Sequence, residues 1–261
     1  MIRSIIVATL LAVFVTPAHA AMMEGDDKYE LEPLIKDKDW QMSAELGFLL
    51  TSGNNDSTSL LGKVDASHDW QKWRLKYELN TLLKRDEKYD EATETERLQT
   101  TAERYFFKAQ GDYELSQTNS IFGLYSYLDD RFGQYVEYIT MAAGYSFRDI
   151  NKKKMYLDLN LGPGYAKATS SLDEKEEGVT MIASAAYNWE ISESARFTQN
   201  FSYQKASFNN LSISESALVT KISNSMQMKV SFRAEHNDSK NTDSDIKSLN
   251  TQTSVTLVVN I

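Results

Sequence analysis

Apolar and polar residues alternate along most of the chain from Trp40 to its last residue. In segment 226–236, the even-numbered positions run Met, Met, Val, Phe, Ala and His, while the odd-numbered positions are all polar or charged. The same alternation recurs in segments 73–80, 155–165 and 195–204. A repeat of two residues is typical of β-strands that present one apolar and one polar face. The pattern therefore predicts an all-β protein, although segments 95–113, 119–130 and 213–222 alternate poorly.

Clusters of Gly, Asn, Asp and Ser separate these segments and predict strand boundaries. We expect strands at roughly 40–51, 57–70, 73–85, 95–114, 119–131, 135–148, 153–168, 178–190, 194–207, 212–222, 226–238 and 246–261. An even number of strands returns both ends of a barrel to the same side, as bacterial single-chain barrels require. The predicted fold is a closed, antiparallel, up-and-down transmembrane β-barrel of about 12 strands. The connections expected to face the outside of the cell lie near 52–56, 86–94, 132–134, 169–177, 208–211 and 239–245. Those expected to face the periplasm lie near 70–72, 115–118, 149–152, 191–193 and 223–225.

A soluble β-sandwich is the main alternative, because it also alternates apolar and polar residues. The expected strands commonly exceed ten residues, whereas strands of soluble proteins usually run about 5–6. Aromatic residues gather near the strand ends, as in the interfacial girdles of membrane barrels; they are Trp40, Trp70, Trp73, Tyr113, Tyr135, Phe147, Tyr187 and Trp189. In lipid an unpaired backbone is costly, so such a sheet has to close. These features favour the membrane barrel over a periplasmic soluble protein.

The first twenty residues have the pattern of a secretory signal peptide. Arg3 supplies a positive start, an apolar-to-small run follows, and Ala18-His19-Ala20 fits a cleavage site with Ala18 and Ala20 as its small residues. An uncleaved helical anchor would need about 20 apolar residues, more than this run provides. We therefore expect a signal peptide at 1–20, an acidic periplasmic tail at 21–39 and an outer-membrane barrel at 40–261.

Composition narrows the classes of function. The formal net charge is −9, which argues against a nucleic-acid partner, because those proteins carry clustered Lys and Arg. The chain has no cysteine, so disulfides, thiolate metal sites and a lipid-modified N-terminal cysteine are excluded. We expect no cofactor and no metal. The expected partners are outer-membrane lipid, lipopolysaccharide and, during biogenesis, the barrel-assembly machinery.

The polar face of the predicted strands would line the lumen and carries both signs of charge. Its expected lumen-lining residues are Arg74, Lys76, Glu78, Asp158, Arg196, Lys229, Arg233 and Glu235. One interpretation is a polar channel for small solutes; the other is a network of ion pairs that fills and stiffens the interior. Eight strands leave a filled interior and sixteen or more leave an aqueous channel, so twelve strands do not decide between the two.

Catalysis has weak support in the sequence. A lipid-acting barrel enzyme would need a histidine within reach of a serine and an orienting third group. His68 and His236 are the histidines of the expected mature chain, next to Ser67 and near Ser239, but Ser67 lies on the opposite face from its neighbour. The acidic run at 173–177 lacks the ligand spacing of a calcium loop. We therefore expect no catalytic residues. The expected function is that of a structural or stress-related barrel, or of a narrow pore for small solutes.

Several short elements of the chain match a known family. They are Thr51-Ser52-Gly53-Asn54, Thr58-Ser59, Trp73-Arg74, Asp112-Tyr113, Asp130-Arg131-Phe132, Gly162-Pro163-Gly164-Tyr165, Trp189 and Ser214-Glu215. Over roughly 40–261 the chain resembles the YdiY-type salt-induced outer-membrane proteins, domain of unknown function 481. The resemblance implies an outer-membrane barrel linked to osmotic or acid stress, and it carries over no catalytic or binding residue.

Two positions depart from that resemblance. Asn55 stands where the family usually has Thr, a change of little consequence in a turn. The chain ends in Ile261 rather than in the aromatic residue that the barrel-assembly machinery usually reads. Ile261 is apolar and falls on the outward face expected for the last strand, so the sequence is compatible with assembly of the barrel.

Overall fold

The structure is a computed structural model that describes residues 38–51, 57–90, 95–239 and 248–260, all of them within one compact unit, Leu31–Ile261. The expected signal peptide at 1–20 with Ala18 and Ala20, the tail up to residue 37, the turn at 52–56 and Ile261 lie outside the described residues. Lys38 and Asp39, assigned to the tail from the sequence, already belong to the first strand.

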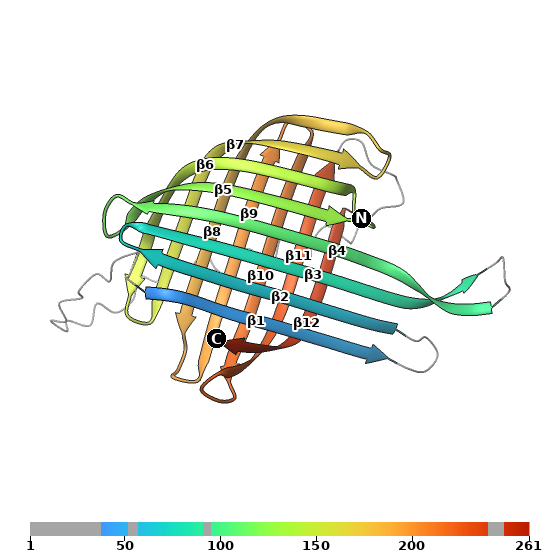
Figure 1. The fold of residues 1–261 in the computed structure, drawn as a ribbon, viewed down its shortest axis with the longest axis horizontal. Coiled ribbons are helices and arrows are strands. Elements are labelled where there is room, and N and C mark those ends of the chain that lie inside the picture. Colours follow the sequence, from blue (N-terminus) through green and yellow to red (C-terminus); the bar gives the residue numbers. More distant parts are fainter. Residues whose placement is uncertain (1–37, 52–56, 91–94, 240–247, 261) are drawn as a thin grey trace, which may run out of the picture. The chain divides into compact units, whose positions relative to one another are not determined.

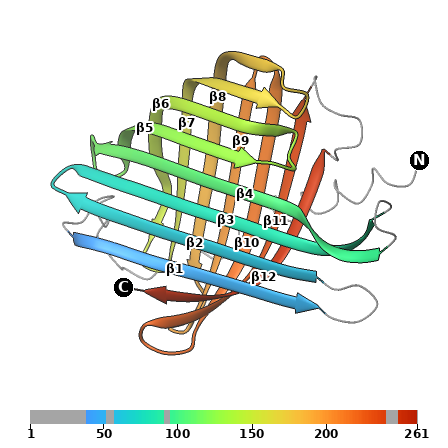
Figure 2. The same cartoon turned by 45° about the vertical axis from the view of Figure 1, so that its right-hand side comes forward.

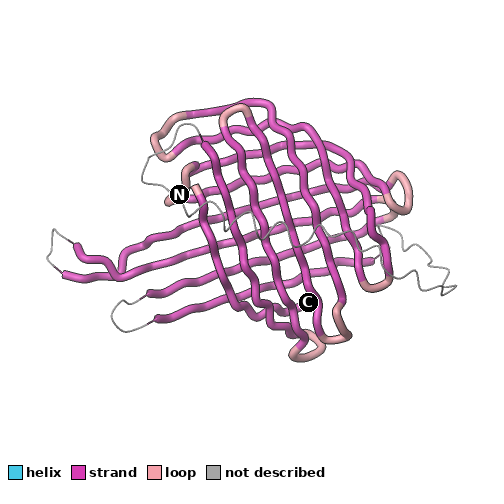
Figure 3. The backbone as a smooth tube through the Cα atoms, turned by 180° about the vertical axis from the view of Figure 1, so that it is seen from behind, coloured by secondary structure: helices cyan, strands magenta, loops and turns pink. Residues whose placement is uncertain are grey.

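Twelve antiparallel strands form a closed barrel in which sequence neighbours pair and the first strand meets the last (Figure 1). The strands are β1 (Lys38–Thr51), β2 (Ser57–Trp70), β3 (Trp73–Asp90), β4 (Thr95–Glu114), β5 (Asn119–Asp130), β6 (Tyr135–Lys152), β7 (Met155–Ser170), β8 (Lys175–Glu190), β9 (Ala195–Ala206), β10 (Asn209–Lys221), β11 (Met226–Ser239) and β12 (Leu249–Asn260). The predicted fold class is confirmed. Seen from behind, the described chain consists of strands and short connections (Figure 3). No helix in the described part of the chain is long and apolar enough to cross a membrane.

The connections define two ends of the barrel. We call the end with connections 71–72, 115–118, 153–154, 191–194 and 222–225 the inner end, and the opposite end the outer end. Four predicted connections were wrong in detail: the one at 149–152 lies at 153–154, the one at 169–177 shrinks to 171–174, the one at 208–211 lies at 207–208, and residues 86–90 of the one at 86–94 belong to β3. Polar residues at these places continue the strands, because backbone pairing in a ladder does not depend on side-chain polarity.

The outward face of the barrel is apolar and exposed. Val230 on β11 is 41% exposed, while its neighbour Ser231 points inward and is 8% exposed. The same contrast runs around the barrel, where exposed outward side chains include Met42, Leu46, Phe48, Leu60, Val64, Leu79, Met141, Leu161, Val179, Met181, Leu218, Met228, Phe232, Val255 and Leu257. A continuous apolar belt on a closed sheet is the surface that a lipid bilayer covers.

Aromatic side chains ring the inner end, as the sequence predicted for an interfacial girdle. Trp73 packs against Tyr113 with ring centroids 5.0 Å apart, and Trp40 stacks on His68 at 4.9 Å. Tyr135 does not join a girdle: it lies at the outer end, 2% exposed, inside the barrel. A bulge between Tyr135 and Glu137 shifts the register of β6 and turns this side chain inward.

Glycines allow a close approach of the β6 and β7 backbones. Their register is interrupted between Ala142–Gly164 and Tyr145–Leu161. A methyl group on Gly144 would overlap the carbonyl oxygen of Leu161, so only glycine fits. Pro163, which has no N–H to donate, falls within the interruption. The Gly-Pro-Gly element at 162–164 thus lies where the two backbones are too close for larger side chains at the glycine positions.

Two parts of the wall differ from the rest. Within the described residues, β1 and β12 pair at four positions, from Ser43–Asn260 to Leu46–Leu257, whereas β10 and β11 pair at thirteen. Figure 2 shows β1 and β12 running together near the end of β12 and separating toward the outer end.

The β3–β4 hairpin extends beyond its neighbours, because β2 reaches only Asp86 on β3 and β5 reaches only Arg104 on β4.

Candidate functional site in the barrel lumen

The lumen contains a cavity of about 490 Å³ walled by side chains from all twelve strands. Six of the eight residues expected to line the lumen lie on its wall: Arg74, Lys76, Glu78, Asp158, Lys229 and Arg233. Glu235 points inward beside it and is 8% exposed. Arg196 is exposed and lines a second cavity of about 400 Å³. The two cavities adjoin, because both are lined by Lys76, Glu78, Lys108 and Gln110.

Ion pairs connect the wall of the cavity on the β11 side. The Lys229 ammonium lies 3.2 Å from Glu45 on β1 and 3.1 Å from Glu215 on β10. Arg233, next along β11, lies 3.8 Å from Glu215 and 3.0 Å from Glu235. Each cation therefore sits between two carboxylates. That alternation of sign compensates the desolvation of charges that are only 10–26% exposed.

One ion pair crosses the lumen. Arg104 on β4 donates a hydrogen bond of 2.9 Å to Glu235 on β11. Around the closed barrel, β4 and β11 are separated by four strands in one direction (β3, β2, β1 and β12) and by six in the other. The two strands therefore belong to nearly opposite walls. Arg104 also lies 3.8 Å from Asp130, the last residue of β5 before the outer connection. The pair is thus placed in the outer half of the barrel and ties its two sides together.

Further charges are paired toward the inner end. Arg74 and Asp69 form a two-bond pair at 2.7 and 2.9 Å. Other pairs toward this end are Arg148–Asp158 at 2.6 Å and Lys76–Asp112 at 3.0 Å. Two-bond Arg–carboxylate contacts fix geometry as well as charge. Arg196 has no ion pair with any residue in the described ranges.

An aromatic cluster fills part of the outer end. Tyr135 and Tyr138 of β6 meet Phe208 from the β9–β10 connection, with ring centroids 5.4–6.0 Å apart. Ala166, Ala168 and Ala206 complete the buried core of this cluster. Below it, the Gln204 amide donates to the Tyr138 and Thr140 hydroxyls at 3.2 and 3.0 Å. Because β6 and β9 are separated by two strands, these contacts cross the curved wall and narrow the lumen.

Sequence reasoning missed five charged residues of this site: Glu45, Arg104, Lys108, Asp112 and Glu215. The polar face of β4 and β10 is interrupted by lumen-facing apolar residues, among them Phe106, Ile213 and Val219. Alternation therefore fails in these strands. The missing signal was the register: Lys108 pairs with Glu78 across β3 and β4, which places it on the same inward face.

The candidates for catalysis and metal binding are not brought together. His68 stacks on Trp40 on the outward face of the inner end, whereas Ser67 pairs in the ladder with inward-facing positions. His236 is exposed on β11 and pairs with Ser212 near the outer end. In the acidic run, Lys175, Glu176 and Glu177 belong to β8 rather than to a loop. Within the described residues, no group of three or more His, Asp or Glu side chains could hold a metal ion.

The closed sheet, the apolar outer belt and the polar lumen define an outer-membrane-type β-barrel. The fold is shared with the outer membrane channel of Pseudomonas putida F1, with a TM-score of 0.51, 10% identity and coverage of 91% of this chain and 99% of that chain. The translocator domain of the autotransporter NalP from Neisseria meningitidis gives a TM-score of 0.50 at 9% identity, covering 85% of this chain and 88% of that one. The NanC porin gives 0.50 at 9% identity, with coverage of 84% and 98%.

The family follows from the sequence. Residues 44–261 match the family described as "Protein of unknown function, DUF481", and the chain belongs to it. It is 28% identical over 212 residues to the uncharacterized protein YdiY of Escherichia coli (strain K12), a match that covers 79% of this chain and 77% of that protein. The predicted resemblance is confirmed.

Proposed function

We propose that this chain is an exported outer-membrane barrel with a closed, ion-paired lumen, which serves envelope adaptation to osmotic or acid stress rather than open diffusion. The observation that carries the proposal is the Arg104–Glu235 pair, whose 2.9 Å contact joins nearly opposite walls. An open channel would leave these walls separated by water.

The Arg104–Glu235 pair belongs to a longer series of ion pairs. Cations and carboxylates alternate from Glu45 through Lys229, Glu215, Arg233, Glu235 and Arg104 to Asp130. A solute that crosses the lumen has to separate members of this series, and an unpaired buried charge costs several kcal/mol. Tyr135, Tyr138 and Phe208 add an apolar barrier at the outer end. Both features support a lumen that is closed outward.

A lipid-acting enzyme has less support, since neither histidine has an assembled serine partner in the described chain. The partners that we propose are outer-membrane lipid and lipopolysaccharide around the belt, and the barrel-assembly machinery during insertion. The apolar belt supports the first two, because it has the chemistry of a lipid-facing surface.

Conductance in a planar bilayer tests the closed lumen. We expect the unmodified protein to give no steady conductance, or a few brief, small steps. Arg233→Ala should produce a persistent leak, because it leaves Glu215 and Glu235 short of a cation. Arg196→Ala is the matched control: Arg196 also faces inward but has no ion pair among the described residues, so this variant should stay closed. Large, stable steps in the unmodified protein would overturn the proposal.

A small-solute channel is the second candidate. The adjoining cavities of about 490 and 400 Å³ favour it, since they leave space in the lumen below the closure. On this alternative, the unmodified protein would show steps that grow with the concentration of a permeant solute. The bilayer recording therefore separates the two candidates directly.

A further inference from the structure

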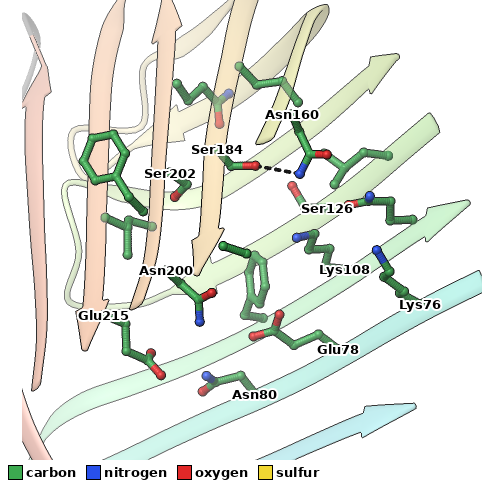
Figure 4. A pocket seen from close by; sticks show the side chains of 18 of the residues that line it. Lys76, Glu78, Asn80, Lys108, Ser126, Asn160, Ser184, Asn200, Ser202 and Glu215 are labelled. Atoms are coloured by element: carbon green, nitrogen blue, oxygen red, sulfur yellow. Dashed lines mark hydrogen bonds between the residues drawn. The ribbon is translucent and has the colours of Figure 1, made fainter. Parts of the chain in front are cut away.

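Below the cross-lumen pair, neutral polar side chains surround one space (Figure 4). They come from β3, β5, β7, β8 and β9 and are Asn80, Ser126, Asn160, Ser184, Asn200 and Ser202. Asn160 donates to Ser184 at 2.9 Å. The side chains of the other four have no hydrogen-bond partner among the residues that the structure describes. We call this space the chamber; its walls offer amide and hydroxyl groups that are open to a ligand.

Lys108 on β4 projects into the same space (Figure 4). Its register partner is Glu78, but that carboxylate lies 3.7 Å from the ammonium of Lys63. The neighbouring Lys76 is held by Asp112 at 3.0 Å. Lys108 forms no ion pair of 4.0 Å or less with any described residue, so it is the lumen lysine whose charge is left without a contact carboxylate. It lies where the two cavities adjoin.

The charges on the wall of the larger cavity also favour an anion. Seven are positive and five are negative: Lys63, Arg74, Lys76, Arg104, Lys108, Lys229 and Arg233 against Glu45, Glu78, Asp112, Asp158 and Glu215. Asp65, Asp69 and Glu235, which lie outside that wall, pair with Lys63, Arg74 and Arg233, so among the described residues Lys108 is the wall cation left without a contact carboxylate. A buried cation without a paired carboxylate favours the approach of an anion.

We propose that the chamber binds a small hydroxylated organic anion, with its negative group on Lys108 and its hydroxyls on the surrounding asparagines and serines. A volume of about 490 Å³ lies within the range of small-molecule sites. The inference rests on the proposed function in one respect: the closure at Arg104–Glu235 makes the chamber a binding site rather than a stretch of open pore.

Three compounds that share a six-carbon polyhydroxylated chain and differ in charge test this assignment: gluconate, sorbitol and N-methylglucamine. Each is titrated calorimetrically into the full-length protein refolded in a non-ionic detergent. We expect gluconate to bind at least about tenfold more tightly than sorbitol, a difference of about 1.4 kcal/mol, and N-methylglucamine to bind most weakly. Lys108→Gln should weaken gluconate at least about tenfold and leave sorbitol unchanged. Lys153→Gln, at an exposed inner connection, is the matched control and should change neither.

Equal affinity for gluconate and sorbitol would overturn the proposal, as would unchanged gluconate binding by Lys108→Gln or the absence of binding at millimolar concentration. Heat-modifiable migration of each variant in a gel establishes that the barrel has closed. Calorimetry does not depend on conductance, so the two proposals can fail separately. A steadily conducting unmodified protein that binds gluconate through Lys108 would refute the closed lumen alone, whereas a closed protein indifferent to Lys108→Gln would refute the anion site alone.

Discussion

Arg104 and Glu235, which are 131 residues apart in the sequence, meet at 2.9 Å across the lumen. Their side chains are 21% and 11% exposed, so water screens the contact little. Glu235 also accepts a hydrogen bond from Arg233, and Arg104 lies near Asp130. The Arg104–Glu235 contact links two parts of the wall that hairpin pairing alone does not bring into contact. Its contribution to the free energy of unfolding can be measured by substituting either residue.

We predict that Glu235→Leu destabilises the barrel by roughly 3 kcal/mol, because it leaves Arg104 and Arg233 buried with reduced compensation. Arg104→Met should have a similar effect. The double variant should be more stable than the sum of the two single changes implies, since it buries no unpaired partner of this contact. Urea unfolding in detergent or vesicles, followed by tryptophan fluorescence, measures the free energies. Additive losses would show that the two side chains do not interact.

A second prediction concerns the register of β3. Leu79 is 52% exposed on the outward face, near the middle of the part of β3 that pairs with β2, whereas Asn80 faces the chamber. Arginine against lipid at the bilayer midplane costs about 2–4 kcal/mol. Leu79→Arg should therefore impair folding into bilayers, while Asn80→Arg should be much milder, because Asn80 lines the same cavity as the carboxylates of Glu78 and Glu215.

Insertion efficiency alone does not identify lipid, since a soluble core would also reject arginine. A spin label at each of the two positions, read with a lipid-soluble and a water-soluble relaxation agent, supplies the missing comparison. Position 79 should respond to the lipid-soluble agent and position 80 should not. An equal response at both positions would contradict the orientation of the whole sheet.

Strand positions and faces could be predicted from the sequence where alternation is clean, because the outward residues there are apolar, as Val230 and Phe232 are. The contacts among side chains inside the lumen could not be predicted in this way. Alternation places position 231 on the polar, lumen-facing side of its strand but does not show what surrounds it. The structure buries Ser231 between Lys229 and Arg233, with its hydroxyl 2.7 Å from that of Ser254. Which inward residues meet across the barrel depends on register and closure, and these are not properties of any one strand.

Arg104 and Lys108 make the same point. Both lie on β4, whose inward positions include Phe106 and whose outward positions include Tyr105 and Phe107, so local alternation is obscured. Arg104 finds its partner only because β4 and β11 face one another in a closed twelve-stranded wall. Lys108 forms no ion pair with any described residue, although its register partner is Glu78, which instead lies 3.7 Å from Lys63. Neither outcome is encoded within a window of neighbouring residues.

The third prediction concerns accessible loops. The outer connection 171–174 is tight, since the amides of Leu172 and Glu174 both donate to the Ser170 hydroxyl. The projecting β3–β4 hairpin carries exposed Lys88 and Arg97 instead. Trypsin added to intact cells should therefore cut within this hairpin first. Cleavage after the exposed lysines at 153–154 should require permeabilised cells. Prompt cleavage at 153–154 in intact cells would invert the topology.

The last prediction concerns the seam between β1 and β12, where the described residues form four register pairs. Local opening starts where the fewest backbone hydrogen bonds must break, so this seam should be the first part of the wall to separate on heating. Ala44 and Val259 are directly opposed there, at a spacing that a disulfide can bridge. The chain has no cysteine, so Ala44→Cys with Val259→Cys introduces a single defined cross-link. Oxidised, this variant should keep its compact gel migration to a higher temperature than the reduced protein. Leu218→Cys with Val230→Cys, opposed across the thirteen pairs of β10 and β11, is the matched control and should shift that temperature less. A larger shift from the control would mean that the wall first opens elsewhere than at the β1–β12 seam.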